Sequence, residues 1–203
     1  MTYYKSLSAD GCSCSGGHSK WSLPTQLEDG TYKPGRWMPR IKDIAPCVRG
    51  YHVFERKDIL QWVNTTLYEA EVRGKTIDHE DKIVAESCRL TRPIPGCCER
   101  TLRLFACRVA EDVLPIFEQA YPDDYRPRAA IETARRYADG NTTPEELAAA
   151  RAAAGTAADA AWAAARAAAR AADAAAARAA DAAWTAAREK YTDWLWEMLE
   201  GER

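Results

Sequence analysis

Hydrophobic and polar positions in the first 96 residues follow the short periods that are typical of strands. Four segments alternate with period two or form short apolar runs: residues 2–7, 50–54, 67–72 and 82–90. The segment between the second and third of these, residues 55–63 (ERKDILQWV), instead places its apolar side chains on one helical face. Glycine and proline turns separate the segments. The pattern predicts a mixed α+β domain over residues 1–96.

After Gly96 the hydrophobic period changes to that of helices. Two helices are predicted, over residues 103–117 and 127–137. Pro115 is expected to kink or end the first, because proline removes a main-chain donor and collides with the preceding turn. Thr143-Pro144-Glu145-Glu146 is a start signal for a third helix, with a capping hydroxyl, proline at the first position and acids against the helix dipole.

The segment from Asp159 to Arg188 is about two-thirds alanine, and most of its other side chains fall on one helical face. The pattern Asp-Ala-Ala-Trp-x-Ala-Ala-Arg occurs at 159–166 and again 22 residues later, which corresponds to two eleven-residue units of three helical turns. A disordered linker has no reason to keep that phase, so a helix is predicted. Its methyl surface is expected to be buried against neighbouring backbones. A turn near Ala172-Asp173 is the alternative to one unbroken helix.

The chain ends on a conventional apolar face, which is expected to dock on the rest of the protein. This face contains Tyr191, Trp194-Leu195 and Met198-Leu199. The fold class predicted from these patterns is α+β: a small mixed α/β N-terminal domain, residues 1–96, and an all-α, alanine-rich helical bundle, residues 97–203.

Composition and charge narrow the classes of partner. The chain is 47% hydrophobic and 29% charged with a net charge of −2, which is ordinary for a soluble globular protein. Residues 1–96 hold 14 basic and 12 acidic residues, and residues 97–203 hold 14 and 18. Neither half has the basic excess of a phosphate-backbone binder, so nucleic acid is not favoured as a partner. No apolar run of about 18 residues or export signal is present, and a cytoplasmic location is expected.

The chain contains an odd number of cysteines, which argues against a disulfide framework and favours reduced thiols. A soft ligand set for zinc is available in Cys12, Cys14, His18, Cys47 and His52. The usual spacing of two to four residues within a ligand pair is missing from it, so buried or loop thiols are the favoured interpretation. The sequence predicts no metal and no cofactor.

The second half resembles a known family of alanine-rich helical domains, labelled as immunity proteins in bacterial and phage genomes. The resemblance covers about residues 99–200 and is carried by three strings: Glu99-Arg100-x-Leu102-Arg103-Leu104-Phe105-Ala106, Ala110 to Leu114, and Tyr121 to Glu132 (YPDDYRPRAAIE). The alanine-rich segment that ends in aromatic residues and leucine completes it. Residues 1–95 resemble an uncharacterised phage and bacterial domain through Cys47 to His52, Leu67 to Val72 and Asp81 to Ala85.

The family label implies a non-enzymatic protein that binds and neutralises a toxin, a nuclease or another defence effector. Phage versions would act as anti-defence inhibitors, for example against CRISPR nucleases. Acidic mimicry of nucleic acid is not the favoured mechanism, because the carboxylates of the second half are interleaved with arginines. A surface of tryptophan and arginine is favoured instead.

Two groups of residues are candidates for partner binding. The first occupies a proline-bracketed corner between helices: Asp123, Asp124, Arg126 and Arg128. Its alternative role is an interhelical charge network. The second group lies on the stripe of the alanine-rich segment: Trp162, Arg166, Arg170, Trp184 and Arg188. A solvated helix face or core tryptophans are the alternatives there, and the alanine face is also a candidate for homodimer formation.

The rival hypothesis is an enzyme. The strands of the first half faintly resemble the ADP-ribosyltransferase type of fold, which implies that Tyr51 or His52 would orient NAD and that Glu69 or Glu71 would polarise its ribose. No glycine-rich phosphate motif supports this alternative. A hydrogen-bonded strand histidine is the favoured interpretation of His52.

Overall fold

The structure, a computed structural model, describes residues 2–14, 19–169 and 174–201, and within residues 157–182 it describes main chain only. The chain divides into two compact units, Met1–Cys98 with Trp196–Arg203 and Glu99–Leu195. The first is rich in strands and the second is helical, so the predicted α+β fold class is confirmed. The sequence pattern placed all of residues 97–203 in the helical domain, whereas the structure groups the last eight residues with the N-terminal unit.

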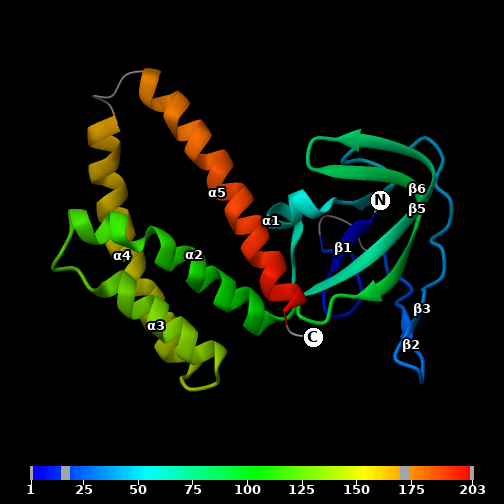
Figure 1. Cartoon of the computed structure of the whole chain (residues 1–203), viewed down its shortest axis with the longest axis horizontal. Helices are drawn as coiled ribbons and strands as arrows, with labels where there is room; N and C mark the ends of the chain where they lie inside the picture. The colour runs from blue at the N-terminus through cyan, green and yellow to red at the C-terminus, as the bar shows by residue number, and fades with distance from the viewer. Residues whose placement is uncertain (1, 15–18, 170–173, 202–203) are drawn as a thin grey trace. The chain divides into compact units, whose positions relative to one another are not determined.

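The N-terminal unit is built on a curled antiparallel sheet of four strands (Figure 1). Its strand order is β1 (Tyr3–Leu7), β5 (Thr66–His79), β6 (Lys82–Pro93) and β4 (Tyr51–Val53). Tyr4 and Phe54 exchange main-chain hydrogen bonds of 2.9 and 3.0 Å, so the first strand meets the end of the last and the sheet forms a half-barrel. The four predicted strands are confirmed, and the third and fourth of them extend beyond their predicted ends as the hairpin β5–β6.

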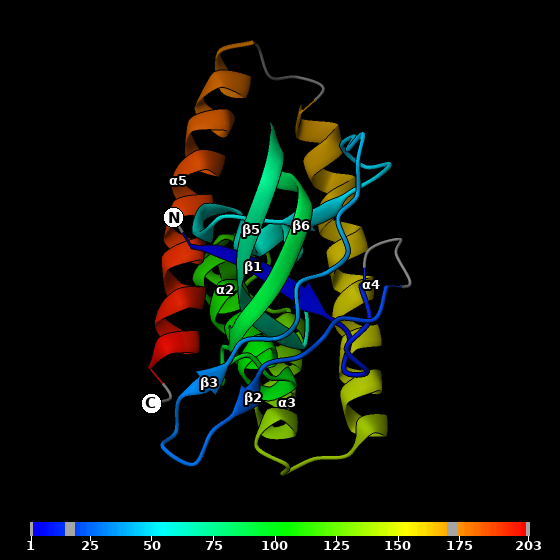
Figure 2. The same ribbon diagram turned by 90° about the vertical axis from the view of Figure 1, so that its right-hand side faces the viewer.

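The chain before β4 completes the edge of β6, because β4 pairs only with Ile83–Ala85. Three main-chain N–H groups donate to three carbonyl groups of β6: Gly35 to Leu90 at 2.9 Å, Met38 to Cys88 at 2.8 Å and Ile41 to Glu86 at 2.8 Å. An uncovered edge strand would expose unpaired main-chain groups that recruit other chains. This segment, which Figure 2 shows running along β6, therefore protects the sheet.

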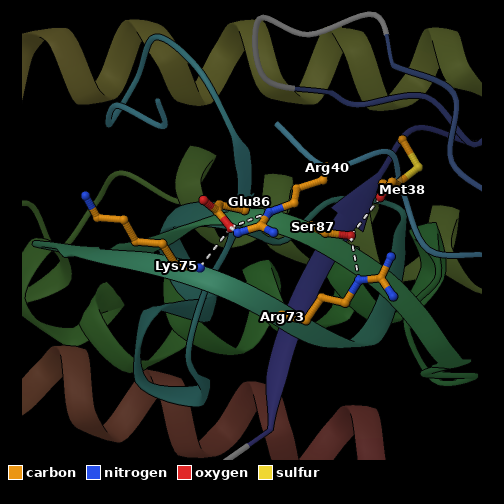
Figure 3. Close-up of polar contacts among 6 residues, drawn as sticks. All are labelled: Met38, Arg40, Arg73, Lys75, Glu86 and Ser87. Carbon is orange, nitrogen blue, oxygen red and sulfur yellow. Dashed lines mark hydrogen bonds and ion pairs between the residues drawn. The ribbon is translucent and has the colours of Figure 1, made fainter. Parts of the chain in front are cut away.

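The buried carboxylate of Glu86, on strand β6, fixes this segment to the sheet (Figure 3). It accepts hydrogen bonds from the Arg40 guanidinium, at 2.8 Å from Nε, and from the main-chain N–H of Lys75 at 3.1 Å. These two hydrogen bonds lower the pKa of Glu86. Gly74, at φ +84° in the bulge of β5, makes room, because a Cβ atom there would lie 2.3 Å from Glu86 Oε2.

Ser87, the next residue of β6, makes a second anchor in the same view. Its hydroxyl donates to the Met38 carbonyl at 2.7 Å and accepts from Arg73 Nε at 3.3 Å. Together the two neighbouring side chains tie the loop that precedes β4 to the hairpin β5–β6. This loop carries residues that line the cavity discussed below.

Short elements complete the N-terminal unit. The helix predicted over residues 55–63 is present as a 3₁₀ turn, η1 (Arg56–Asp58), followed by α1 (Ile59–Trp62). A small hairpin pairs β2 (Thr25–Gln26) with β3 (Tyr32–Lys33). The end of the last helix contributes Trp196 and Leu199, which are buried. Of the predicted apolar face at the C-terminus, Leu195 and Leu199 are buried and the other members are half-buried. Trp196, which the sequence pattern did not assign to this face, is fully buried.

The helical unit contains α2 (Glu99–Ala120), α3 (Arg126–Ala138), α4 (Pro144–Ala169) and the part of α5 (Ala174–Glu200) that ends at Leu195. Figure 1 shows α2 and α3 side by side, with α4 against α3. Asp112 of α2 accepts hydrogen bonds from Lys190 Nζ at 2.5 Å and from the Tyr191 hydroxyl at 2.9 Å. These contacts fix α5 on α2.

The helix boundaries confirm one sequence signal and correct another. The Thr143 hydroxyl accepts from the Glu146 N–H at 3.2 Å, and the Glu146 carboxylate accepts from the Thr143 N–H at 3.3 Å. This reciprocal capping box starts α4 as predicted. Of the two outcomes expected at Pro115, a kink or an end of the helix, the end is wrong, because α2 continues through Pro115 to Ala120. The turn expected near Ala172-Asp173 lies outside the described residues.

The burial expected for the methyl surface between Asp159 and Arg188 falls mostly on side chains outside the described part of the chain. Of the alanines at its described end, Ala183 and Ala186 are exposed. Near the start of α4, which packs mainly on α3, the exposed alanines are Ala148, Ala149, Ala152 and Ala153. The intrinsic helix propensity of alanine, the highest of all residues, allows a helix to present such a surface to solvent.

A search of the described helices for a membrane span was negative, because each is too short or too polar to cross a bilayer.

Candidate functional site

The corner that joins α2 to α3 is held by one carboxylate. Asp124 accepts hydrogen bonds from the main-chain N–H of Arg126 at 3.1 Å and from its guanidinium nitrogens at 2.8 and 2.6 Å. The side-chain hydrogen bond from Arg126 lowers the pKa of Asp124. Because a carboxylate at this position satisfies a main-chain donor at the helix start, the pair fixes where α3 begins.

A ladder of ion pairs closes the seam between α2 and α3. Arg128 of α3 forms two hydrogen bonds of 2.7 Å with Glu118 of α2. Two turns further along α3, Arg135 pairs in the same forked manner with Glu111 at 2.7 and 2.5 Å. These ion pairs form the interhelical charge network that was expected from the sequence as the alternative to partner binding. Asp124, Arg126 and Arg128 therefore have partners within the chain.

Asp123 and Tyr125 add exposed side chains to this corner. Asp123 makes no hydrogen bond or ion pair with the described part of the chain. Tyr125, at the N-cap position of α3, is 69% exposed. On α2, close to the same corner in sequence, Ile116 is 73% exposed and Val113 is 46% exposed. Large apolar side chains that the fold leaves uncovered are typical of interaction surfaces where they form a patch.

An apolar groove has Val113 in its wall. It has a volume of about 410 Å³ and lies among α2, α3 and α4. Its walls include Cys107, Val113, Leu114, Phe117, Ile131 and Ala154. The apolar stripe of α2 is therefore only partly covered by the neighbouring helices. We refer to Val113, Ile116, Asp123 and Tyr125 as the corner surface.

Sequence reasoning missed two members of the corner surface. Tyr125 lies inside the string that carried the family resemblance, but only the charges around it were considered as contact residues. Ile116 follows Pro115 and lies off the apolar stripe of α2. A hydrophobic residue at a helical position that is otherwise polar was the signal that could have identified it as exposed.

The second predicted group is only partly described. Trp184 is 73% exposed, and Arg188 is half-buried. Arg170 lies outside the described residues, and the side chains of Trp162 and Arg166 lie outside the described part as well. The proposal of a continuous stripe of tryptophan and arginine therefore remains a prediction beyond Trp184.

The residues considered for an enzyme site do not line one common cavity. Tyr51 and His52 line a cavity in the N-terminal unit, and Glu69 and Glu71 are not among the residues that form its wall. The Glu69 carboxylate accepts two hydrogen bonds from Arg92, and that of Glu71 accepts one of 2.7 Å from Arg89. His52 Nε2 accepts a hydrogen bond of 3.1 Å from the Cys47 N–H, which confirms its interpretation as a hydrogen-bonded strand histidine.

The structure does not bring the proposed zinc ligands together. Within residues 2–14, 19–169 and 174–201, no group of three or more His, Cys, Asp or Glu side chains is placed to hold a metal ion. His18, one member of the set, lies outside these ranges. No disulfide joins any of the seven cysteines.

Comparison with known proteins places the helical unit in a family context. Residues 98–191, somewhat less than half of the chain, match the family model described as "Imm-5 like putative immunity protein". The matched segment coincides with α2 to α4 and most of α5. The C-terminal half thus resembles this family, whereas nothing in the comparisons supports the resemblance expected for residues 1–95. No curated protein and no solved structure matches the chain.

Proposed function

We propose that the helical unit is the partner-binding module of an immunity-type protein, which binds and neutralises a toxin or another effector protein in the cytoplasm without catalysing a reaction. One observation carries the proposal. The segment that matches the immunity family also contains Val113, Ile116, Tyr125 and Trp184, four large apolar side chains that the fold leaves exposed. An immunity role requires an accessible protein-binding surface, and these side chains supply one.

The corner surface has the chemistry of a protein interface. Tyrosine and tryptophan are favoured anchors, since each offers a large contact area at a small cost in side-chain entropy. The unpaired carboxylate of Asp123 next to Tyr125 adds one charge that selects a basic partner residue. Asp124, Arg126 and Arg128 support this surface by fixing the start of α3.

The stripe on the alanine-rich segment forms the second contact region of the proposal. Trp184 is its exposed member among the described side chains. Trp162, Arg166, Arg170 and Arg188 are assigned to it from the sequence pattern. The exposed methyl face of α4 is the surface through which a homodimer would form.

Matched bait proteins test the proposal. The wild-type chain, an Asp123→Lys/Tyr125→Ala variant and a Glu132→Lys control would each be immobilised and exposed to lysate of the native host. Glu132 is exposed on α3 outside the corner, so the control carries the same type of charge change. A captured protein counts only if the wild type and the control retain it at least about tenfold better than the corner variant, the loss expected for removing a hot spot.

A growth assay then separates neutralisation from simple binding. The captured protein, expressed alone, should arrest growth, and co-expression of the wild type or the control should restore growth where the corner variant does not. Equal capture by all three baits, or growth arrest that the wild type fails to relieve, would overturn the proposal. Retention by the corner variant with loss in Trp184→Ala would move the contact to the stripe.

A narrower form of the proposal makes the effector a nuclease of a host defence system, such as a CRISPR nuclease, with the protein acting for a phage. Purified nuclease and DNA substrate test this form directly. Cleavage should stop at stoichiometric amounts of wild-type protein and continue with the corner variant. An inhibited effector without nuclease activity would leave the general proposal standing and reject the narrower one.

A further inference from the structure

A cavity of about 300 Å³ lies within the N-terminal unit where β1 and β4 separate. The two strands meet through Tyr4 and Phe54, and the cavity lies along the residues that come next to this bridge on each strand. Its wall contains Lys5, Ser6, Trp21, His52, Trp62 and Lys82. It therefore combines large aromatic surfaces with two cationic side chains.

Lys5 is the unusual member of the wall. Its side chain is partly buried, and Nζ lies 5.4 Å from the centroid of the Trp21 ring. Within the residues that the structure describes, it forms neither a hydrogen bond nor an ion pair with a carboxylate. Burial lowers the pKa of its ammonium group. A charge removed from water is normally paired, because desolvation favours the neutral form of an unpaired group.

The second cation of the wall is already neutralised. Lys82 Nζ lies 3.4 Å from Asp81 Oδ1 and 4.8 Å from the centroid of the Trp62 ring. Desolvation followed by the charges of Lys5 and Lys82 lowers the pKa of His52, which favours its neutral form. The charge of the cavity that lacks a partner is therefore the single positive charge of Lys5.

We propose that this cavity binds a small organic anion, a carboxylate carried on a flat ring, with the carboxylate at Lys5 and the ring against Trp21. A carboxylate would neutralise the ammonium group of Lys5 and accept a charge-assisted hydrogen bond from it. The ring would cover the aromatic walls, which an inorganic anion would leave in contact with water. The volume is at the lower end of the range for ligand pockets and suits a single-ring compound. The site is independent of the corner surface.

Sodium benzoate is the probe, with benzamide as its uncharged analogue and inorganic phosphate as the anion without a ring. Titration calorimetry at pH 7 should show saturable binding of benzoate to the wild-type chain, at least roughly tenfold tighter than benzamide or phosphate, the ratio expected for one charge-assisted contact. The NMR signal of the Trp21 indole N–H should shift with benzoate, and that of Trp184, exposed in the helical unit, should not.

A variant assigns the charge. Lys5→Met keeps the length of the side chain and should weaken benzoate binding at least roughly tenfold. Lys42→Met, which removes an exposed lysine outside the cavity wall, should leave binding unchanged. The comparison of benzoate with benzamide uses wild-type protein and does not depend on the folding of any variant. Absence of saturable binding, equal binding of benzamide, or equal binding of phosphate would overturn the proposal.

Discussion

The indole Nε1 of Trp196 donates a hydrogen bond of 2.9 Å to the main-chain oxygen of Arg56, 140 residues earlier in the chain. The same indole is fully buried and lies 4.6 Å from the ring centroid of Tyr4. The Arg56 guanidinium lies over it at 4.4 Å and also pairs with Glu200 at 2.6 Å. The last turn of α5 is therefore a structural part of the strand-rich unit.

Removal of this indole should destabilise the N-terminal unit strongly. Trp196→Ala deletes a large buried side chain and leaves the Arg56 carbonyl without its donor, so we expect the free energy of unfolding to fall by about 3–5 kcal/mol. Urea unfolding followed by circular dichroism measures the change. Trp184→Ala is the matched control: its indole is 73% exposed, and its removal should change the free energy of unfolding by less than about 0.5 kcal/mol. Equal losses in the two variants would contradict this account of Trp196.

Much of the fold could be predicted because its signals are local. The alternation over residues 67–72 and the capping hydroxyl of Thr143 lie within a few residues of the elements that they specify. The extra length of β5 could not be predicted in the same way. Its second half is polar and exposed on both faces, and it is a strand because β6 pairs with it as far as His79–Lys82.

The candidate sites depended more on contacts between distant residues. The corner charges could be recognised from the sequence, but their partners could not, because Glu118 and Arg128 are brought together by the packing of α2 on α3. Lys5 appeared to be an ordinary polar residue of an alternating strand. Its position over Trp21 and its lack of an acidic partner are properties of the folded unit. The exposed alanines near the start of α4 show that a composition typical of close packing can also occur on an open helix surface.

The pair of Arg128 and Glu118 should contribute to stability through its charge alone. Arg128→Glu places two carboxylates opposite each other, and we expect a loss of roughly 0.5–1 kcal/mol, limited by the exposure of both side chains, 49% and 31%. The exchanged pair, Glu118→Arg with Arg128→Glu, should recover most of that loss in thermal unfolding. A double variant as unstable as the single one would show that the ion pair is not what stabilises the seam.

Two buried thiols should be protected from modification. Burial raises the pKa of Cys88 and of Cys97 to about 12, so both remain protonated at pH 8, where thiolate is the reactive form. The exposed Cys14 and Cys47 should react with a thiol reagent first. Alkylation of native protein followed by mass spectrometry of its peptides distinguishes the sites, and protein in denaturant provides full labelling as the reference. Early labelling of Cys88 in native protein would contradict its burial.

Protonation of His52 should make the protein less stable in mild acid. Its folded pKa is lowered, first by desolvation and then by the charges of Lys5 and Lys82 with a smaller contribution from His79. As the pH falls below about 6.5, the unfolded state therefore binds a proton more readily than the folded state does, and stability decreases until the folded pKa is reached. Protonation also removes the acceptor for the Cys47 N–H, because neutral Nε2 accepts that hydrogen bond.

The variant His52→Gln isolates this effect, since an amide oxygen can accept the same hydrogen bond without titrating. The free energy of unfolding, measured in urea at pH 7 and at pH 5, should fall more for the wild type than for His52→Gln. The excess is limited to about 1.4 kcal/mol per pH unit for a single proton. Contributions from the other titrating groups are common to both proteins and cancel in the comparison. Equal losses of stability on acidification would mean that His52 binds its proton equally well in the folded and unfolded chains, contrary to its desolvated position beside two lysines.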